Sequence, residues 1–157
     1  MAAVVPARTV TVGDVHACAI AISGGEVWCW GSNDDGQLGV TPSVEEPPTR
    51  AGSLDGMREI AAGRTHTCAL DADGRVLCWG ANTNQQLSYV GASSATPVVV
   101  SLPAKATAVH AGSDAVHVCA TLEDGSVWCW GSSSAGQLGR GPDAQPGLPG
   151  PMLIPCS

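Results

Sequence analysis

Phenylalanine is absent from the 157 residues of this sequence, and tyrosine occurs once. The other aromatic side chains are five tryptophans, and all of them stand in one short segment that recurs along the chain. These residues are Trp28, Trp30, Trp79, Trp128 and Trp130. The bulky aromatic mass is therefore placed once per repeat, and the remaining apolar content is mostly alanine, valine and leucine.

Positive charge is scarce as well. Seven Lys and Arg residues are set against 14 Asp and Glu, which gives a net charge of −7. The basic residues, such as Arg8, Arg50 and Arg140, are scattered and form no stripe that would neutralise phosphates. We therefore expect no nucleic acid and no anionic membrane surface as a direct partner.

Long apolar segments and helix-forming segments are also missing. No run of about 18 apolar residues is present to span a bilayer, and the 20 Gly, 11 Pro and many β-branched residues exclude long helices. Residues 1–6 carry no basic stretch before their apolar run, so we do not interpret them as a signal peptide. The 44% hydrophobic content still predicts a folded chain, and the length suits a single repeat domain over residues 1–157.

What the chain does contain is a threefold repeat. A Cys-Trp-Gly segment occurs three times, each preceded by a His-x-Cys segment and followed by a Gln-Leu segment. Measured on the histidine, the period is 50 residues from His16 to His66 and 51 residues from His66 to His117. A fixed period of this length predicts a repeat architecture. We place the repeats at approximately residues 9–50, 58–102 and 106–154.

Each repeat is built around a predicted β-hairpin. Two apolar runs flank a turn, at Gly24-Gly25, Asp73-Gly74 and Asp124-Gly125. The runs lack a clean polar alternation, which is typical of strands buried on both faces. The sequence thus predicts an all-β fold of β-propeller-type blades with antiparallel strands, stacked face to face, and a β-solenoid is the alternative. We interpret residues 40–55 as a Pro- and Glu-containing connector and residues 2–6 as a short strand.

Six of the seven cysteines occupy equivalent positions in the three hairpins. Cys68 and Cys78 lie at equal distances from Asp73 along the chain, so they should face each other at a Cα separation of about 4.5–5.5 Å. A disulfide bridges such a distance. The predicted bonds are Cys18–Cys29, Cys68–Cys78 and Cys119–Cys129. A β-bulge beside Gly24-Gly25 would absorb the extra residue of the first pair, and Cys156 is left for a partner in sequence beyond this chain.

The same histidines and cysteines are also candidates for a metal site or a nucleophile and base. His16, Cys18 and Cys29 would give three ligands for an open zinc site. We favour a structural role, because the set occurs three times and such periodicity is typical of a scaffold. Asp71-x-Asp73-Gly74 resembles the start of a calcium loop, but the closing Glu is absent. We expect no enzyme activity, no catalytic residue, no metal site and no cofactor.

Variable polar loops follow the three Cys-Trp-Gly segments. They differ from copy to copy at equivalent positions, as binding loops on a shared scaffold can. Solvated turns would look the same, and that alternative stays open. The candidate interaction residues are Asn33, Asp34, Asp35, Asn82, Asn84, Ser133 and Ser134.

These motifs resemble the repeats of the regulator of chromosome condensation family. The resemblance rests on His66-Thr-Cys-Ala-Leu70, Cys78-Trp79-Gly80 and Gly36-Gln37-Leu38-Gly39, and it covers about residues 9–154. It implies a seven-bladed β-propeller, of which three repeats supply an incomplete ring. Further repeats, or self-association, would then be needed to close the ring. The cysteine-rich variant is similar to versions found in bacterial exported or surface proteins.

The resemblance also sets the expected functions. Members of the family include an exchange factor for a small GTPase and a bacterial inhibitor of β-lactamases. The inserted hairpin and basic tail of the exchange factor are not found here. We expect a non-enzymatic scaffold that binds an unidentified protein and is part of a longer protein that is extracellular or on the cell surface. A cytoplasmic regulator of a small GTPase, or an enzyme-inhibitor propeller, is the alternative.

Overall fold

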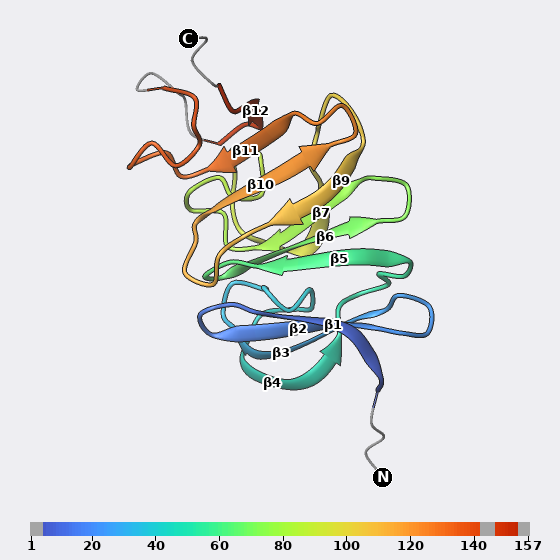
Figure 1. The fold of residues 1–157 in the computed structure, drawn as a ribbon. Coiled ribbons are helices and arrows are strands. Elements are labelled where there is room, and N and C mark those ends of the chain that lie inside the picture. The colour runs from blue at the N-terminus through green and yellow to red at the C-terminus, as the bar shows by residue number, and fades with distance from the viewer. Residues whose placement is uncertain (1–4, 142–146, 154–157) are drawn as a thin grey trace.

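The computed structural model describes residues 5–141 and 147–153, which form three four-stranded antiparallel sheets without a helix among them (Figure 1). Blade 1 consists of β1 (Ala7–Val12), β2 (His16–Ala21), β3 (Val27–Asn33) and β4 (Ser43–Arg50). Blade 2 consists of β5 (Met57–Ala62), β6 (His66–Asp71), β7 (Val76–Gly80) and β8 (Ser94–Val99). Blade 3 consists of β9 (Ala106–His110), β10 (His117–Leu122), β11 (Val127–Gly131) and β12 (Gly150–Pro151). Within each blade the strands pair in chain order, so the predicted all-β fold is confirmed.

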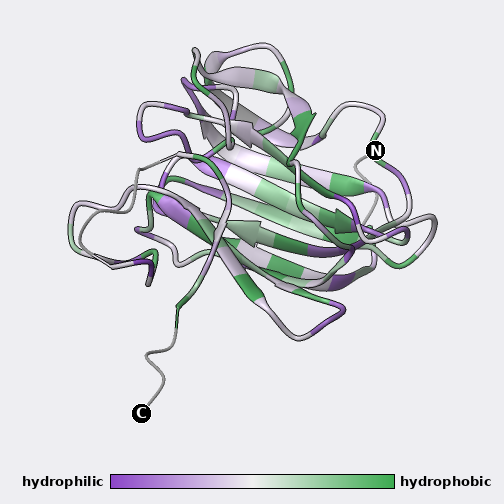
Figure 2. Ribbon diagram, turned by 90° about the horizontal axis from the view of Figure 1, so that it is seen from above, coloured by the Kyte–Doolittle hydropathy of each residue, from purple (hydrophilic) through white to green (hydrophobic). Residues whose placement is uncertain are grey.

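The blades stack face to face, with blade 2 in the middle (Figure 1). Side chains alternate between the two faces of a strand, so on β6 Ala69 packs against blade 1 while Cys68 and Leu70 pack against blade 3. We call the two packed surfaces junction 1–2 and junction 2–3. Hydrophobic colour follows the central strands, and the hydrophilic segments lie mainly in the loops at their ends (Figure 2). A strand buried on both sides explains why the apolar runs of the sequence show no polar alternation.

The fourth strand of blade 1 corrects a prediction. Residues 40–55 lack a strand pattern, yet Ser43–Arg50 forms β4. This strand lies at the edge of the sheet and pairs only with β3, where a proline is tolerated because its missing N–H faces away from the ladder. The β3–β4 register shifts between Cys29 and Gly31, opposite Pro47 and Pro48. An edge strand with this irregular pairing leaves no clear sequence signal.

Two smaller predictions about blade 1 also change. No register shift interrupts the pairing of β2 with β3, so the predicted bulge is wrong and the extra residue lies in the turn. The Ala21 amide donates to the Glu26 carbonyl there, whereas in blade 2 the shorter turn is closed by Asp71 and Arg75. Gly24 and Gly25 have φ values of 74° and 66°, a region that glycine enters without strain. The strand predicted over residues 2–6 begins instead at Ala7, and residues 2–4 lie outside the described range.

The described part of the chain also contains no helix with the length and hydrophobicity needed to cross a bilayer.

Candidate interaction rim

The loops that follow β3, β7 and β11 emerge on the same side of the stack, at the left in Figure 1. We call this edge the rim. Neighbouring loops touch one another along it, because Ser93 Oγ lies 3.5 Å from Asp35 Oδ1 and the Cα of Gly36 faces Ala95 at close range. The rim is therefore a continuous surface across blades 1 and 2.

A buried asparagine organises each of the first two loops. Asn33 Oδ1 accepts a hydrogen bond from the Leu38 amide at 3.1 Å, and Asn33 Nδ2 donates to the Thr41 carbonyl at 2.8 Å. Asn82 does the same in blade 2, with the Leu87 amide at 3.0 Å and the Tyr89 carbonyl at 3.0 Å. Both asparagines are buried. They hold the loops in shape and are not available to a partner, which corrects their selection as candidate interaction residues.

A glutamine closes each of the three loops from inside. Gln37 Oε1 accepts from the Asp35 amide at 3.0 Å, and Gln86 Oε1 accepts from the Asn84 amide at 2.8 Å. In blade 3, Gln137 Oε1 accepts from the Ala135 amide at 2.8 Å. The leucines that follow these glutamines are fully buried in all three copies. Each loop therefore has the same hydrogen-bonded base, whatever residues stand at its tip.

The second loop keeps this backbone without its glycines. Gln85 and Ser88 stand where the other copies have Gly36 and Gly39, and their φ values are 58° and 64°. A residue with a side chain is destabilised in this left-handed region by roughly 1–2 kcal/mol. The loop conformation is thus imposed by the surrounding contacts and not by local preference.

Most of the remaining candidate residues form the tips of the loops. Asp34, Asn84 and Ser134 are exposed, and Asp35 is half-buried. Thr83 and Ala135 share these tip positions in the other copies, and both are exposed. Ser133 is half-buried and takes the position of Asn33 and Asn82 in the third copy. The tips thus differ in charge and hydrogen-bonding capacity from blade to blade, while a glutamine closes the loop in every copy.

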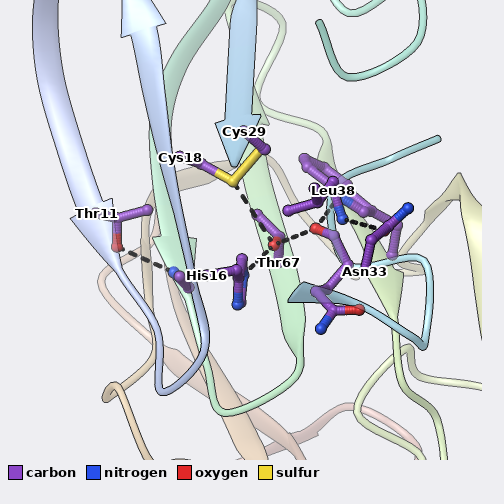
Figure 3. The surroundings of a disulfide bond; sticks show 10 residues. Thr11, His16, Cys18, Cys29, Asn33, Leu38 and Thr67 are labelled. Carbon is purple, nitrogen blue, oxygen red and sulfur yellow. Dashed lines mark hydrogen bonds between the residues drawn. A yellow bond between two sulfur atoms is a disulfide. The ribbon is translucent and has the colours of Figure 1, made fainter. Parts of the chain in front are cut away.

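A chain of hydrogen bonds crosses junction 1–2 beneath the rim (Figure 3). The Thr67 hydroxyl donates to the Gln37 carbonyl at 2.9 Å, so its oxygen accepts from His16 Nε2 at 2.8 Å. Trp79 Nε1 donates to the same Gln37 carbonyl at 2.9 Å. The loop of blade 1 is therefore fixed to blade 2 by two donors on one oxygen.

Junction 2–3 repeats only part of this chain. Trp130 Nε1 donates to the Gln86 carbonyl at 2.9 Å. Val118 takes the position of Thr67, and neither ring nitrogen of the fully buried His66 has a hydrogen-bond partner within the described residues. The tryptophan contact therefore recurs at both junctions, whereas the histidine contact occurs at only one.

Burial changes the titration of these histidines. Desolvation lowers the pKa of His16 to about 4. Desolvation, with smaller contributions from the charges of His16 and His117, lowers the pKa of His66 to about 3. Partial burial also lowers the pKa of His117. The junction imidazoles are therefore neutral at neutral pH.

The cysteines of each hairpin are joined in the structure. The bonds are Cys18–Cys29, Cys68–Cys78 and Cys119–Cys129, each with a Cα separation of 4.1 Å. Because their sulfur atoms are bonded to one another, they present no thiolate to a metal ion. No group of three His, Cys, Asp or Glu side chains is placed to hold a metal ion in the described ranges. Cys156 lies outside those ranges.

Sequence reasoning missed the glutamine carbonyls that receive the tryptophan indoles. A signal for them is present, because a Gln-Leu pair stands at the end of each copy and a tryptophan at a fixed place in the next. It also treated His16 and His66 as equivalent. The three copies differ one residue after the histidine, at Ala17, Thr67 and Val118, and that difference determines the bonding of each ring.

Stacked four-stranded blades, each linked by a loop carbonyl to the tryptophan of the next, define a β-propeller repeat protein. The chain belongs to the regulator of chromosome condensation family. Repeats described as "Regulator of chromosome condensation (RCC1) repeat" match residues 7–37, 57–86 and 115–137 in one form and residues 24–70 and 73–120 in another. Each unit of the second form runs from the hairpin of one blade into the next blade, and so includes one junction.

Similar proteins are much longer than this chain. "Regulator of chromosome condensation" of Mus musculus is 33% identical over 139 residues, which cover 83% of this chain and 32% of that protein. "E3 ubiquitin-protein ligase HERC2" of Homo sapiens is 33% identical over 149 residues, which cover 88% of this chain and 3% of that protein. Among solved structures, Prp20p of Saccharomyces cerevisiae matches with a TM-score of 0.82 at 23% identity, over 94% of this chain and 38% of that chain. The chain therefore spans about a third of these relatives or less, and the structural likeness establishes the fold.

Proposed function

We propose that this chain is a non-enzymatic scaffold that binds another protein through the loop tips of its rim. The observation that supports it is the contrast within each loop. A glutamine that closes the loop and a buried leucine form the base in all three copies, and a buried asparagine joins them in the first two, while the exposed tip residues at equivalent positions change from Asp34 to Thr83 to Ser134. A rigid base with variable exposed residues suits recognition, because little ordering is required when a partner binds.

The relatives add a coarser argument. The structure of Prp20p was described together with its binding properties to Gsp1p and histones. A protein with this fold thus has described binding properties to other proteins, but a fold alone does not determine the partner. We carry over only the general role of a protein-binding propeller.

We further propose that the chain is part of a longer repeat protein that is exported or displayed on the cell surface. The argument comes from the three disulfide pairs, because disulfides persist in oxidising compartments and are rare in the cytosol. Rapid alkylation of intact cells, followed by mass spectrometry of the non-reduced protein, tests this proposal. Six alkylated cysteines at these positions after unfolding would contradict it and would favour the cytoplasmic alternative.

The binding test compares the chain with a variant altered only at the tips. The variant carries Asp34→Ala, Asp35→Ala, Asn84→Ala and Ser134→Ala. Proteins cross-linked to the chain in cells are identified, produced separately, and measured for binding by interferometry. We expect the tip variant to bind about tenfold more weakly or worse, and a base-disrupting Asn33→Ala control to lose both binding and stability. Equal binding by the tip variant and the unaltered chain would show that the loop tips of the rim do not bind the partner.

The GTPase regulator is tested in parallel. Candidate small GTPases loaded with a fluorescent guanine nucleotide are mixed with the purified chain, and nucleotide release is followed. We expect the nucleotide to be released at its spontaneous rate, because the inserted hairpin of the exchange factor has no counterpart in this sequence. Stimulated release would establish the alternative.

A further inference from the structure

A cavity of about 610 Å³ lies on blade 2, between the hairpin turn that joins β6 to β7 and the connection from β8 to β9. This turn is at the right in Figure 1, at the end of the strands opposite the rim. Repeats added at either end of the stack would not cover the cavity, because blade 2 already has a blade on each side. The residues that line it include Asp73, Arg75, Val76, Val99, Leu102 and Lys105. We call it the blade 2 cavity, and its volume is in the range of ligand-binding pockets.

The same place in blade 1 is closed by ion pairs. Arg50, at the end of β4, pairs with Asp55 in the connection from β4 to β5. Arg50 also lies 3.6 Å from Glu26 of the hairpin turn. The arginine side chain therefore spans the gap between the turn and the connection.

Blade 2 has apolar residues where blade 1 has this ion pair. Val99 takes the place of Arg50 in the pairing of the edge strand, and Ala104 takes the place of Asp55 in a connection of the same length. Val99 is 56% exposed. The two substitutions remove the bridge and leave an open hollow with apolar walls.

Lys105 supplies a positive charge at the edge of the blade 2 cavity. Its stem lies beside the hairpin turn, because a Cβ added to Gly74 would stand 2.7 Å from the Lys105 Cβ. The other cation, Arg75, is already paired with Asp71 and Asp73. None of the ion pairs in the part of the chain that the structure describes includes Lys105. The cavity thus complements a ligand that is both apolar and negatively charged.

The edge of β8 adds hydrogen-bonding groups beside the cavity. β8 is the last strand of its sheet and pairs only with β7. The Val100 amide donates to the Val76 carbonyl of blade 2, so the amide and carbonyl of Val99 point away from the sheet, since these groups alternate in direction along a strand. Pro97 has no N–H to offer, which limits the usable edge to a short stretch. An extended peptide binds such an edge through its main chain.

We propose that the blade 2 cavity binds an extended peptide segment of a partner protein, with a large apolar side chain in the cavity and an adjacent acidic side chain paired with Lys105. The peptide backbone bonds to the outward amide and carbonyl of Val99. Val99 and Leu102 contact the apolar side chain. This site is at the opposite end of the blade from the rim, and it does not depend on the function proposed for the loop tips.

Short synthetic peptides with blocked ends test the chemistry of the ligand. The probes carry a central Leu-Glu, Phe-Glu or Trp-Glu pair, and matched peptides replace the acid by Gln or the apolar residue by Ala. Binding is followed by fluorescence anisotropy and by the NMR shift of the Val99 amide. We expect loss of the apolar side chain to weaken binding by about tenfold or more. Loss of the acid should weaken it by roughly two- to fivefold, as for an exposed ion pair.

Two variants of the chain test the residues. Lys105→Gln should bind the Glu and Gln peptides equally and keep the preference for a large apolar side chain, a pattern that a merely structural lysine would not produce. Val99→Arg combined with Ala104→Asp introduces the ion pair of blade 1 and should abolish binding. This double variant should fold, because Arg50 and Asp55 show that the repeat accepts the pair.

Val44→Arg is the control for the added charge. It lies on the edge strand of blade 1 and is 82% exposed, so it should bind the peptides as the unaltered chain does. Each variant is first checked by urea denaturation, and the Lys105→Gln comparison decides the matter if the double variant does not fold.

Absence of binding by every peptide at up to about 1 mM overturns the proposal. So does a Lys105→Gln variant that still prefers the Glu peptide, or a folded double variant that binds as tightly as the unaltered chain. Saturable binding of octanoate without binding of any peptide also contradicts it, since the cavity would then take a small apolar acid.

Discussion

Junction 1–2 and junction 2–3 use the same positions of the repeat and bond their histidines differently. The Thr67 oxygen accepts a hydrogen bond from His16, and the Thr67 hydroxyl donates one to the Gln37 carbonyl, whereas Val118 offers His66 no such contact. An unpaired polar group in a buried site is destabilising by about 1–3 kcal/mol. Junction 2–3 nevertheless keeps its tryptophan contact and a larger apolar cluster. The comparison indicates that packing and the indole bond hold the blades together, and that the histidine bond adds to them.

Removing the tryptophans should have the largest effect on this comparison. Trp79→Ala and Trp130→Ala should each lower the free energy of unfolding by about 3–5 kcal/mol, because each leaves a large cavity. Trp130→Ala should be the worse by about 1 kcal/mol. It leaves the Gln86 carbonyl without a donor, whereas the Gln37 carbonyl still accepts from Thr67. Urea denaturation of the oxidised protein measures both.

The matched control is Trp30→Ala in blade 1, at the same position of the first repeat. Trp30 is half-buried, so this variant should lose less stability than either junction variant. Equal losses at all three positions would contradict the view that the two junctions provide the main stabilisation.

Acid should weaken both junctions through their histidines. The folded pKa of about 4 for His16 and about 3 for His66 lies below the ordinary histidine pKa of 6.5, so the unfolded chain takes up each proton first. The stability that each neutral histidine contributes is complete above the unfolded pKa and is lost as the pH falls toward the folded pKa. At about pH 5 the loss should be about 2 kcal/mol for each histidine. His16→Asn and His66→Asn should each remove about half of this dependence on pH.

The exposed His110→Gln is the control, because it removes an imidazole without touching either junction. Urea midpoints measured across the acid range for the four proteins provide the comparison. An unchanged profile in both junction variants would show that other groups cause the loss of stability in acid.

Thr67→Val should convert junction 1–2 into a copy of junction 2–3. The side chain keeps its shape but loses its hydroxyl, so His16 Nε2 loses its acceptor while the Trp79 bond remains. We expect the free energy of unfolding to fall by about 1–3 kcal/mol. Thr121→Val makes the same change at a half-buried position outside the junctions and should have little effect. If the two variants unfold at the same urea concentration, the His16–Thr67 bond does not stabilise the protein.

The fold could be predicted from the sequence because each repeat carries the same local information. The period, the hairpin turns and the continuous apolar strands all predict stacked blades, and the equal spacing of Cys68 and Cys78 about Asp73 sets their register. β4 could not be predicted, since an edge strand with two prolines lacks both periodicity and strand-forming residues. The similarity to known repeats was also visible, and the family match confirms it.

The site could be predicted only in outline. Polar residues after each Cys-Trp-Gly segment indicate a loop, but their sequence does not distinguish Asn33, which is buried in the base, from Asp34, which is exposed at the tip. That distinction depends on which backbone carbonyls the folded loop brings within hydrogen-bonding distance of the asparagine side chain. The bonding of His66 likewise depends on a residue of the next repeat, and only the stacking of blades brings Val118 to it.

Val118→Thr should make junction 2–3 resemble junction 1–2, with the smallest effect and the opposite sign. A threonine at this position can donate to the Gln86 carbonyl and accept from His66 Nε2, as Thr67 does for Gln37 and His16. The new hydrogen bonds should raise the free energy of unfolding by about 1 kcal/mol. Nitrogen NMR of the His66 ring should then show a proton held on Nε2 and protected from exchange.

The control for this gain is Val76→Thr, which buries a hydroxyl in the same junction near the hairpin turn. It should be destabilising by about 1–3 kcal/mol, because the hydroxyl would be buried in an apolar cluster. The two substitutions are chemically identical and both positions are fully buried, so a difference in sign can only come from the neighbours of each hydroxyl. If Val118→Thr also destabilises the protein and leaves the His66 resonances unchanged, the two histidines are not interchangeable. Some other feature of junction 2–3 would then have to compensate for its unpaired ring.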